Sequence, residues 1–89
     1  MEVVFSEYFQ YRARLRGFEL SKIRKIVVYS SERYWDTVTG RMIAVGKHGQ
    51  HIVMIPYEQE GEILKPITIH ATTRRQINFR IHTGRFIYE

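Results

Sequence analysis

Residues suited to acid–base catalysis and phosphate binding gather in one stretch of the chain, 67–82. This stretch carries two histidines and three arginines but no acidic residue, and it reads as a strand that runs directly into a helix. If Ile69 and Ala71 face the helical layer, strand alternation turns His70 to the other face of the sheet. His70 is therefore a candidate general base or acid. The structural alternative is a buried strand histidine whose hydrogen bonds are satisfied.

Arg74 and Arg75 fall at the expected start of the helix. The free backbone N–H groups of a helix N-terminus already attract an anion, so the two arginines predict a phosphate site. Without an anion, like charge at the positive end of the helix dipole costs stability. The structural alternative is an ion pair of Arg74 with Glu32 or Asp36.

A metal centre is not expected from the histidines. His48 and His51 flank a tight turn in an H-x-x-H spacing, but no carboxylate stands at ligand spacing beside them or beside His70. The chain has no cysteine, which excludes a disulfide, a thiolate nucleophile and a cysteine zinc site. We therefore expect no metal and no other cofactor.

The charge balance favours a polyanionic partner such as RNA. Fourteen Lys and Arg against nine Asp and Glu give a net charge of +5 and a pI near 9.8. The charges are also segregated, because residues 12–25 hold six cations and one acid whereas residues 58–62 are acidic. Charges that only keep a surface hydrated do not need to be segregated in this way.

The elements that must position these residues indicate a single α+β domain over residues 1–89. Ser6 is the expected cap of a first helix that ends near Gly17, and Tyr8, Tyr11 and Leu15 recur in it at helical spacing. Leu20 begins a second helix. Short β-branched and aromatic runs then predict strands at 33–37, 41–47, 51–57 and 63–71, an acidic loop at 58–62, and a last helix at 74–83. We expect two N-terminal helices and one C-terminal helix packed on an antiparallel sheet of four or five strands.

This order of elements resembles the RelE/ParE superfamily of toxins and the related BrnT group. The resemblance rests on the stretch GKHGQHIVMIPYEQEGEILKPITIHATTRRQ, which looks like two hairpinned strands followed by a final strand with a basic end, and on the late tyrosine Tyr88. It implies a RelE-like fold, cleavage of messenger RNA, in some members on the ribosome, and neutralisation by a small antitoxin. ParE-like members share the fold but poison DNA gyrase, so the fold does not fix the activity.

The leading hypothesis is a metal-independent endoribonuclease in which the 2′-hydroxyl of the RNA attacks the adjacent phosphate. The residues expected to act are, for catalysis, His70, Arg74, Arg75, His82 and Tyr88, and, for RNA binding, Lys47, Phe79, Arg80 and Arg85. The two adjacent arginines would hold the phosphate, and Tyr88 or His82 would be the second proton-transfer group. Phe79 would stack on a base.

A non-enzymatic module that binds nucleic acid or an acidic protein through the same basic face is the alternative hypothesis. The N-terminus lacks the basic start and long apolar run of a signal peptide, and no stretch approaches the ~18 apolar residues of a membrane-spanning helix. We therefore expect a cytoplasmic protein without a membrane partner.

Overall fold

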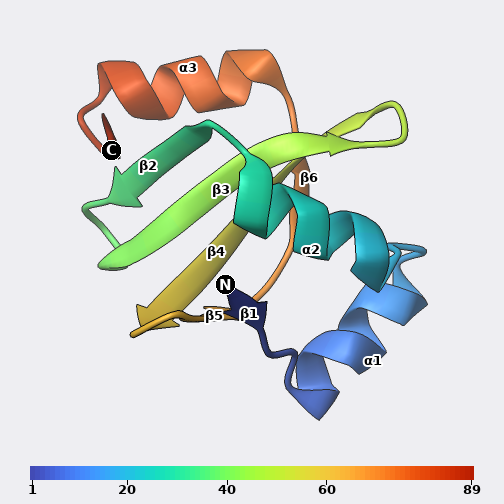
Figure 1. Ribbon diagram of the computed structural model, residues 1–89. Helices are drawn as coiled ribbons and strands as arrows, with labels where there is room; N and C mark the ends of the chain where they lie inside the picture. Colours follow the sequence, from blue (N-terminus) through green and yellow to red (C-terminus); the bar gives the residue numbers. More distant parts are fainter.

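One mixed sheet of seven strands and three helices make up the fold in the computed structural model, which describes residues 1–89 (Figure 1). The elements are β1 (Glu2–Val3), α1 (Glu7–Leu15), α2 (Leu20–Tyr29), β2 (Glu32–Asp36), β3 (Arg41–His48), β4 (His51–Glu60), β5 (Ile63–Pro66), β6 (His70–Thr72), α3 (Arg74–His82) and β7 (Phe86–Tyr88). The predicted α+β class with three helices is thus confirmed.

The sheet differs from the prediction in extent and direction. Its order is β1-β5-β4-β3-β2-β7, with β6 also paired to β4. The expected antiparallel sheet of four or five strands is wrong, because β1 pairs with β5 in parallel and seven strands take part. The two edge strands are only two and three residues long, which is too short for a period of two to be recognised in the sequence.

The expected acidic loop at 58–62 is mostly strand. β4 continues through Glu58 to Glu60, and its last residues pair with β5, so the turn is confined to Gly61 and Glu62. Gly61 has a φ of +61°, a conformation that glycine adopts at no steric cost. The acidic side chains are exposed, and a solvent-facing strand carries such residues as readily as a loop does.

The single strand expected at 63–71 is divided into β5 and β6. Both pair antiparallel with β4, but with different halves of it. The break follows Pro66, which has no N–H for the ladder, and Ile67 donates to the carbonyl of Pro56 at 2.8 Å. β6 therefore starts afresh at His70, on the way from the sheet to α3.

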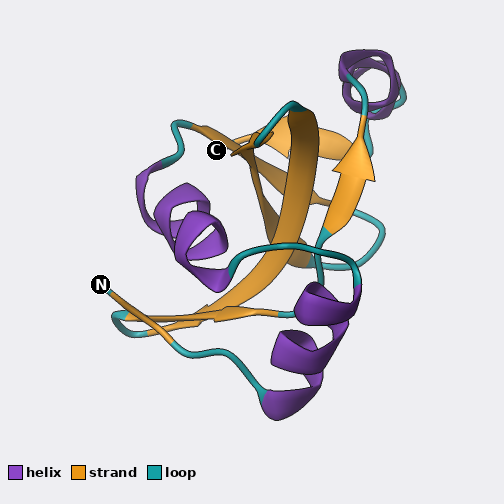
Figure 2. Ribbon diagram, turned by 90° about the vertical axis from the view of Figure 1, so that its right-hand side faces the viewer, coloured by secondary structure: helices purple, strands orange, loops and turns teal.

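Side-chain alternation creates two cores, one on each face of the sheet (Figure 2). On one face α1 and α2 pack on Ala44, Val53 and Ile55. On the other face Ile77 of α3 is fully buried in a smaller cluster of β2, β3 and β7 side chains, which consists of Tyr34, Ile43, Val45 and Phe86. The last helix thus lies on the opposite face from the first two.

The predicted caps hold the first and last helices. Ser6 Oγ accepts from the N–H of Phe9, and Thr73 Oγ accepts from the N–H of Gln76. α1 buries Phe9 and Ala13, whereas the three residues whose spacing indicated the helix are exposed, namely Tyr8, Tyr11 and Leu15. None of the three helices combines the length and the apolar character needed to cross a membrane.

Candidate nucleic-acid interface

Arg74, one of the two arginines predicted at a phosphate site, is paired with an acid. Its guanidinium donates to both carboxylate oxygens of Glu32, one of the two bonds measuring 3.1 Å. The hydroxyl of Tyr34 donates to the same carboxylate at 2.6 Å. The hydrogen bonds from Arg74 are the largest influence that lowers the pKa of Glu32. The structural alternative raised by the sequence is therefore present, and the charge of Arg74 is largely neutralised.

Tyr88 lies in this same cluster rather than beside His70. The rings of Tyr88 and Tyr34 are 4.9 Å apart on the adjacent strands β7 and β2. Tyr34 is fully buried, and burial together with the Glu32 carboxylate raises the pKa of its hydroxyl. The structure thus distributes the predicted catalytic residues between separate places.

Arg85 is tied to a buried acid. Its Nε and one Nη each donate to an oxygen of Asp36 at 3.1 Å, and Asp36 is only 2% exposed. Burial acts to raise the pKa of Asp36, but the bonds from Arg85 and from the backbone of Val38 outweigh it and leave this pKa lowered. Arg85 therefore fastens the start of β7 to the end of β2, and only the remaining part of its side chain faces solvent.

His70 is exposed on the α3 face of the sheet, as strand alternation predicted. Its register partner in β4 is Met54, which packs against the core beneath α3. Partial desolvation lowers the pKa of His70, and the charges of Arg16, Arg80 and Arg12 lower it further. The lowered pKa favours the neutral imidazole, which is the form that can accept a proton.

Arg12 lies in α1 and Arg16 directly follows it, and the sequence analysis did not assign this helix to the site. A small pocket of about 80 Å³ separates α1 from the chain before β6, and Tyr8, Arg12, Arg16 and His70 help to line it. The signal was available in the sequence, because residues 8, 12 and 16 are four apart and share one face of a helix.

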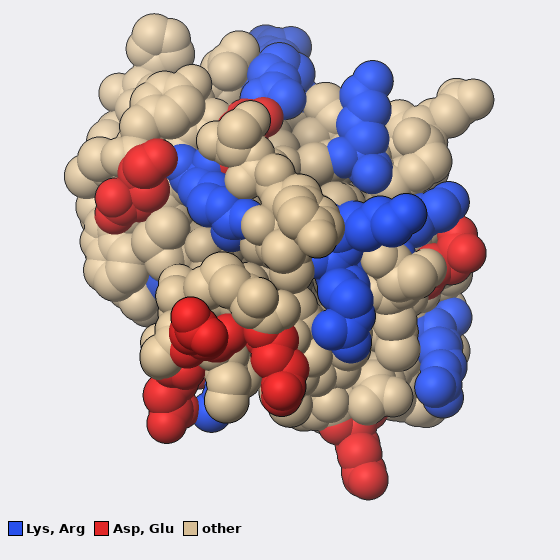
Figure 3. All heavy atoms as spheres, viewed as in Figure 1, with Lys and Arg blue, Asp and Glu red and all other residues tan.

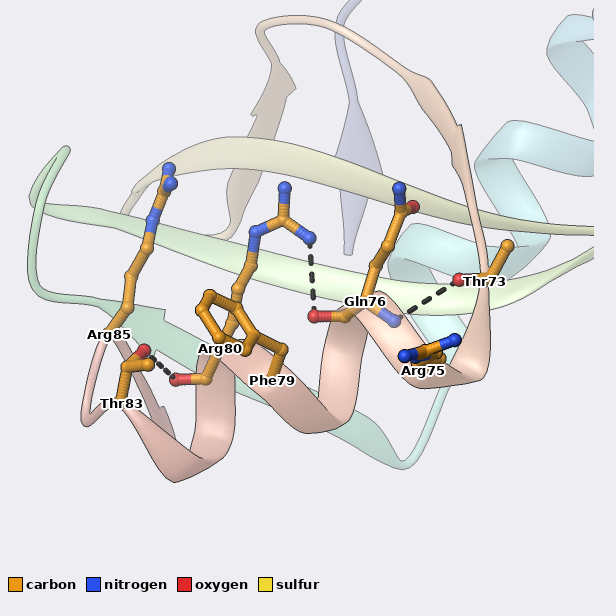
Figure 4. A pocket seen from close by; sticks show the side chains of 7 residues that line it. All are labelled: Thr73, Arg75, Gln76, Phe79, Arg80, Thr83 and Arg85. Carbon is orange, nitrogen blue, oxygen red and sulfur yellow. Dashed lines mark hydrogen bonds between the residues drawn. The ribbon is translucent and has the colours of Figure 1, made fainter.

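The third arginine, Arg80, borders a larger groove of about 540 Å³ along the outer side of α3 (Figure 4). Figure 4 shows the side chains of Gln76, Arg80 and Arg85 extending toward the same side of the helix. Arg80 also donates to the backbone oxygen of Gln76 and stacks over Phe86. The groove is lined by Thr73, Arg75, Gln76, Phe79, Arg80, Thr83 and Arg85. Its one large apolar side chain, Phe79, is 67% exposed.

The small pocket and the α3 groove lie on the two sides of β6, because residues of α1 help to line the pocket and residues of α3 line the groove. Figure 2 shows β6 running between α1 and α3, which flank it. We call this region the β6 surface and define it by Arg12, Arg16, His70, Arg75 and Arg80. None of the five forms an ion pair, so the surface attracts anions.

The side chains of Lys47 and His82 form no hydrogen bond or ion pair. Lys47 lies near the β3–β4 turn opposite Ile52, on the same face as His70, and His82 is exposed in the last turn of α3. His48 is buried instead, and its Nε2 accepts from the backbone N–H of Glu19 at 2.9 Å, just before α2. No group of three or more His, Asp and Glu side chains is placed to hold a metal ion.

The segregation of charge along the chain persists in three dimensions (Figure 3). In this view Lys and Arg gather mainly over the half of the molecule where α1 and α2 lie. Most Asp and Glu lie over the other half and along the lower edge. The acidic residues of 58–62 end the β4–β5 hairpin, away from the β6 surface. The part of the molecule with α1 and α2 is therefore the more attractive one for a polyanion in this view.

No family model, curated protein or solved structure matches the chain. The resemblance to the RelE/ParE superfamily and the BrnT group thus stays a prediction. Because one fold hosts many activities, the function is argued below from the side chains of the β6 surface.

Proposed function

We propose that the protein is a metal-independent endoribonuclease whose reaction centre is His70. One observation carries the proposal: the exposed imidazole of His70 lies among arginines, with Arg12 and Arg16 on one side and Arg80 on the other. A base beside fixed cations is the combination that phosphoryl transfer from RNA requires.

In the proposed reaction His70 accepts the proton of a ribose 2′-hydroxyl. The 2′-oxygen forms a bond to the adjacent phosphorus while the bond from phosphorus to the 5′-oxygen breaks. The leaving oxygen takes a proton, which leaves a 2′,3′-cyclic phosphate and a 5′-hydroxyl. The arginines stabilise the negative charge that develops on the phosphoryl oxygens.

The structure favours a different distribution of roles from the one expected. Arg80 and the two α1 arginines are better placed than Arg74, whose charge is held by Glu32. Tyr8 lines the same pocket as His70, so its hydroxyl is a better candidate proton donor to the leaving oxygen than Tyr88 or His82. Phe79 and Arg75 border the groove in which the neighbouring nucleotides would lie.

The proposal includes the substrate and partner implied by the resemblance. Messenger RNA, free or on the ribosome, would be cut, and a small antitoxin that covers the β6 surface would block access to His70. A cationic surface of this kind suits either an RNA or an acidic segment of such a protein.

The decisive experiment compares two exposed histidines. Purified protein is incubated with messenger RNA in chelator, with and without ribosomes, and the new ends are mapped for wild type, His70→Gln and His51→Gln. We expect His70→Gln to lower cleavage a hundredfold or more while RNA binding persists, because general-base catalysis contributes about 10²–10⁴-fold. His51 lies at the β3–β4 turn and serves as the matched control.

Absence of cleavage by wild type in both conditions, or equal cleavage by both variants, would rule out this role of His70. The α3 groove favours one second candidate, a module that binds RNA without turnover, because binding through Arg75, Arg80 and the exposed Phe79 needs no general base. That candidate predicts binding that weakens with salt, and no new RNA ends.

A further inference from the structure

The pocket between α1 and β6 concentrates hydrogen-bond donors from two segments. Tyr8, Arg12 and Arg16 approach it from one face of α1, and Thr68 and His70 from the opposite side. No acidic side chain is among its eight lining residues. The pocket is therefore electropositive and has no internal partner for its charge.

Two hydrogen bonds fix the α1 arginines at the rim of the pocket. Arg12 Nη1 donates to the Tyr8 hydroxyl oxygen at 2.7 Å, and Arg16 Nη1 donates to the backbone oxygen of Ile69 at 3.0 Å. Each guanidinium has five N–H groups, so both keep donors for a ligand. Since Arg12 donates to the phenol oxygen, the Tyr8 hydroxyl hydrogen is also free to point at an acceptor. The donors are thus held in place before any ligand arrives.

The size of the pocket restricts what it can hold. Its volume of about 80 Å³ is far smaller than the 540 Å³ of the α3 groove. The pocket is nevertheless large enough for several water molecules, so a small anion fits in it. A single phosphate group is small enough for the pocket, and the α3 groove offers more room for a nucleobase or a ribose.

We propose that this pocket is a phosphate-binding site that holds a single phosphate group of the RNA, with Arg12, Arg16 and the Tyr8 hydroxyl as donors. The identification of that phosphate as the one beside the cleaved bond rests on the proposed function, since His70 lines the same pocket. The binding itself depends only on the pocket. Inorganic phosphate should therefore occupy it in the absence of RNA.

The test uses inorganic phosphate as the probe and the His70 imidazole as the reporter. Phosphate is titrated at constant ionic strength into wild type, Arg12→Gln and Arg14→Gln, and the imidazole proton shift is followed by NMR. Arg14 is the matched control, because it lies on the same helix, is exposed and makes no side-chain hydrogen bond. We expect saturable binding that Arg12→Gln weakens at least about tenfold, since a hydrogen bond to a charged group contributes this much. Arg14→Gln should leave it unchanged.

A second variant separates the pocket from a general effect of charge. Tyr8→Phe keeps the net charge and the ring but removes one donor, so phosphate binding should weaken while the thermal stability changes little. Equal phosphate affinity in wild type, Arg12→Gln and Tyr8→Phe would overturn the proposal, whether or not the protein cleaves RNA. If phosphate binding depends on Arg12 but wild type does not cut RNA, the pocket stands and the proposed nuclease is wrong.

Discussion

Arg74 and Arg75 are neighbours in the chain but have different surroundings: Arg74 is locked to Glu32 by two hydrogen bonds, whereas Arg75 borders the open α3 groove. The two positions therefore form a natural matched pair. We expect Arg75→Gln to weaken binding of a short single-stranded RNA and to reduce the slope of log affinity against log salt by about 0.7, the value for one phosphate contact. Arg74→Gln should change both quantities much less.

Fluorescence anisotropy at two salt concentrations measures these effects. Lys25→Gln, an exposed position on α2, controls for the loss of one positive charge. If Arg74→Gln weakens RNA binding as much as Arg75→Gln does, the ion pair with Glu32 opens in the complex. The phosphate site first predicted at the helix start would then be restored.

Arg85→Ala should act on stability rather than on RNA. The substitution leaves the buried carboxylate of Asp36 without its cation, and removing one partner of a buried pair costs about 3–5 kcal/mol. Arg85 is partly exposed, so we expect the lower part of that range in urea unfolding. RNA affinity per folded molecule should change little. A large loss of affinity without a loss of stability would assign Arg85 to the RNA.

The Arg85–Asp36 pair should also influence how the free energy of unfolding declines at acid pH. The pKa of Asp36 is lowered in the folded state, so its contribution to stability is present above the ordinary value of 3.8 and is lost as the pH falls through the folded value. Unfolding free energies measured from pH 6 to pH 2 should therefore decline less steeply in Asp36→Asn than in wild type. Parallel curves would show that other carboxylates dominate acid unfolding.

The pKa of His70 should respond to Arg80. This pKa lies below its ordinary value of 6.5 because of partial desolvation and the charges of Arg16, Arg80 and Arg12. Removing a cation in Arg80→Gln favours the protonated form, so the imidazole titration observed by NMR should move to higher pH. In an active enzyme the acid limb of kcat/KM should shift in the same direction, because His70 acts as a base only when it is neutral. Arg24→Gln, on α2, should leave the titration in place.

Gly46 of β3 lies directly against Ile26 of α2. A Cβ at this position would lie 2.8 Å from Ile26 Cγ2 and 2.9 Å from Cγ1. Gly46→Ala should therefore lower the free energy of unfolding by about 1–3 kcal/mol, the usual cost of overpacking a core. The double variant Gly46→Ala, Ile26→Val should recover part of this loss. No recovery would mean that the backbone, rather than Ile26, bears the strain.

Local signals predicted most of the elements. Ser6 and Thr73 mark helix starts by capping, and Gly84 marks the end of α3, where its φ is +78°. The pairings that complete the sheet could not be predicted in this way. β1 pairs with a strand some sixty residues later, and β7 with the far side of β2, so both depend on tertiary contacts that no local pattern encodes.

The candidate site was predicted only in part, again because tertiary contacts leave no local pattern in the sequence. That Ile69 and His70 point to opposite faces was predicted, because alternation is local to a strand. Which cations surround His70 depends on where α1 lies relative to residues 67–70, and the position of α1 follows from burial of Phe9 and Ala13. Arg74 was assigned from its helix position alone, and its partner on β2 is 42 residues away.

The pairing of β7 with β2 has a consequence for biosynthesis. β2 receives its neighbour on one side within a few residues, but its other edge stays open until residues 86–88 are available. During translation that edge offers free backbone groups to any extended chain nearby. The strands of the sheet therefore cannot all pair in the order in which they are synthesised. Because α3 packs on residues of β7, the surface proposed to bind RNA is completed only when synthesis has passed β7.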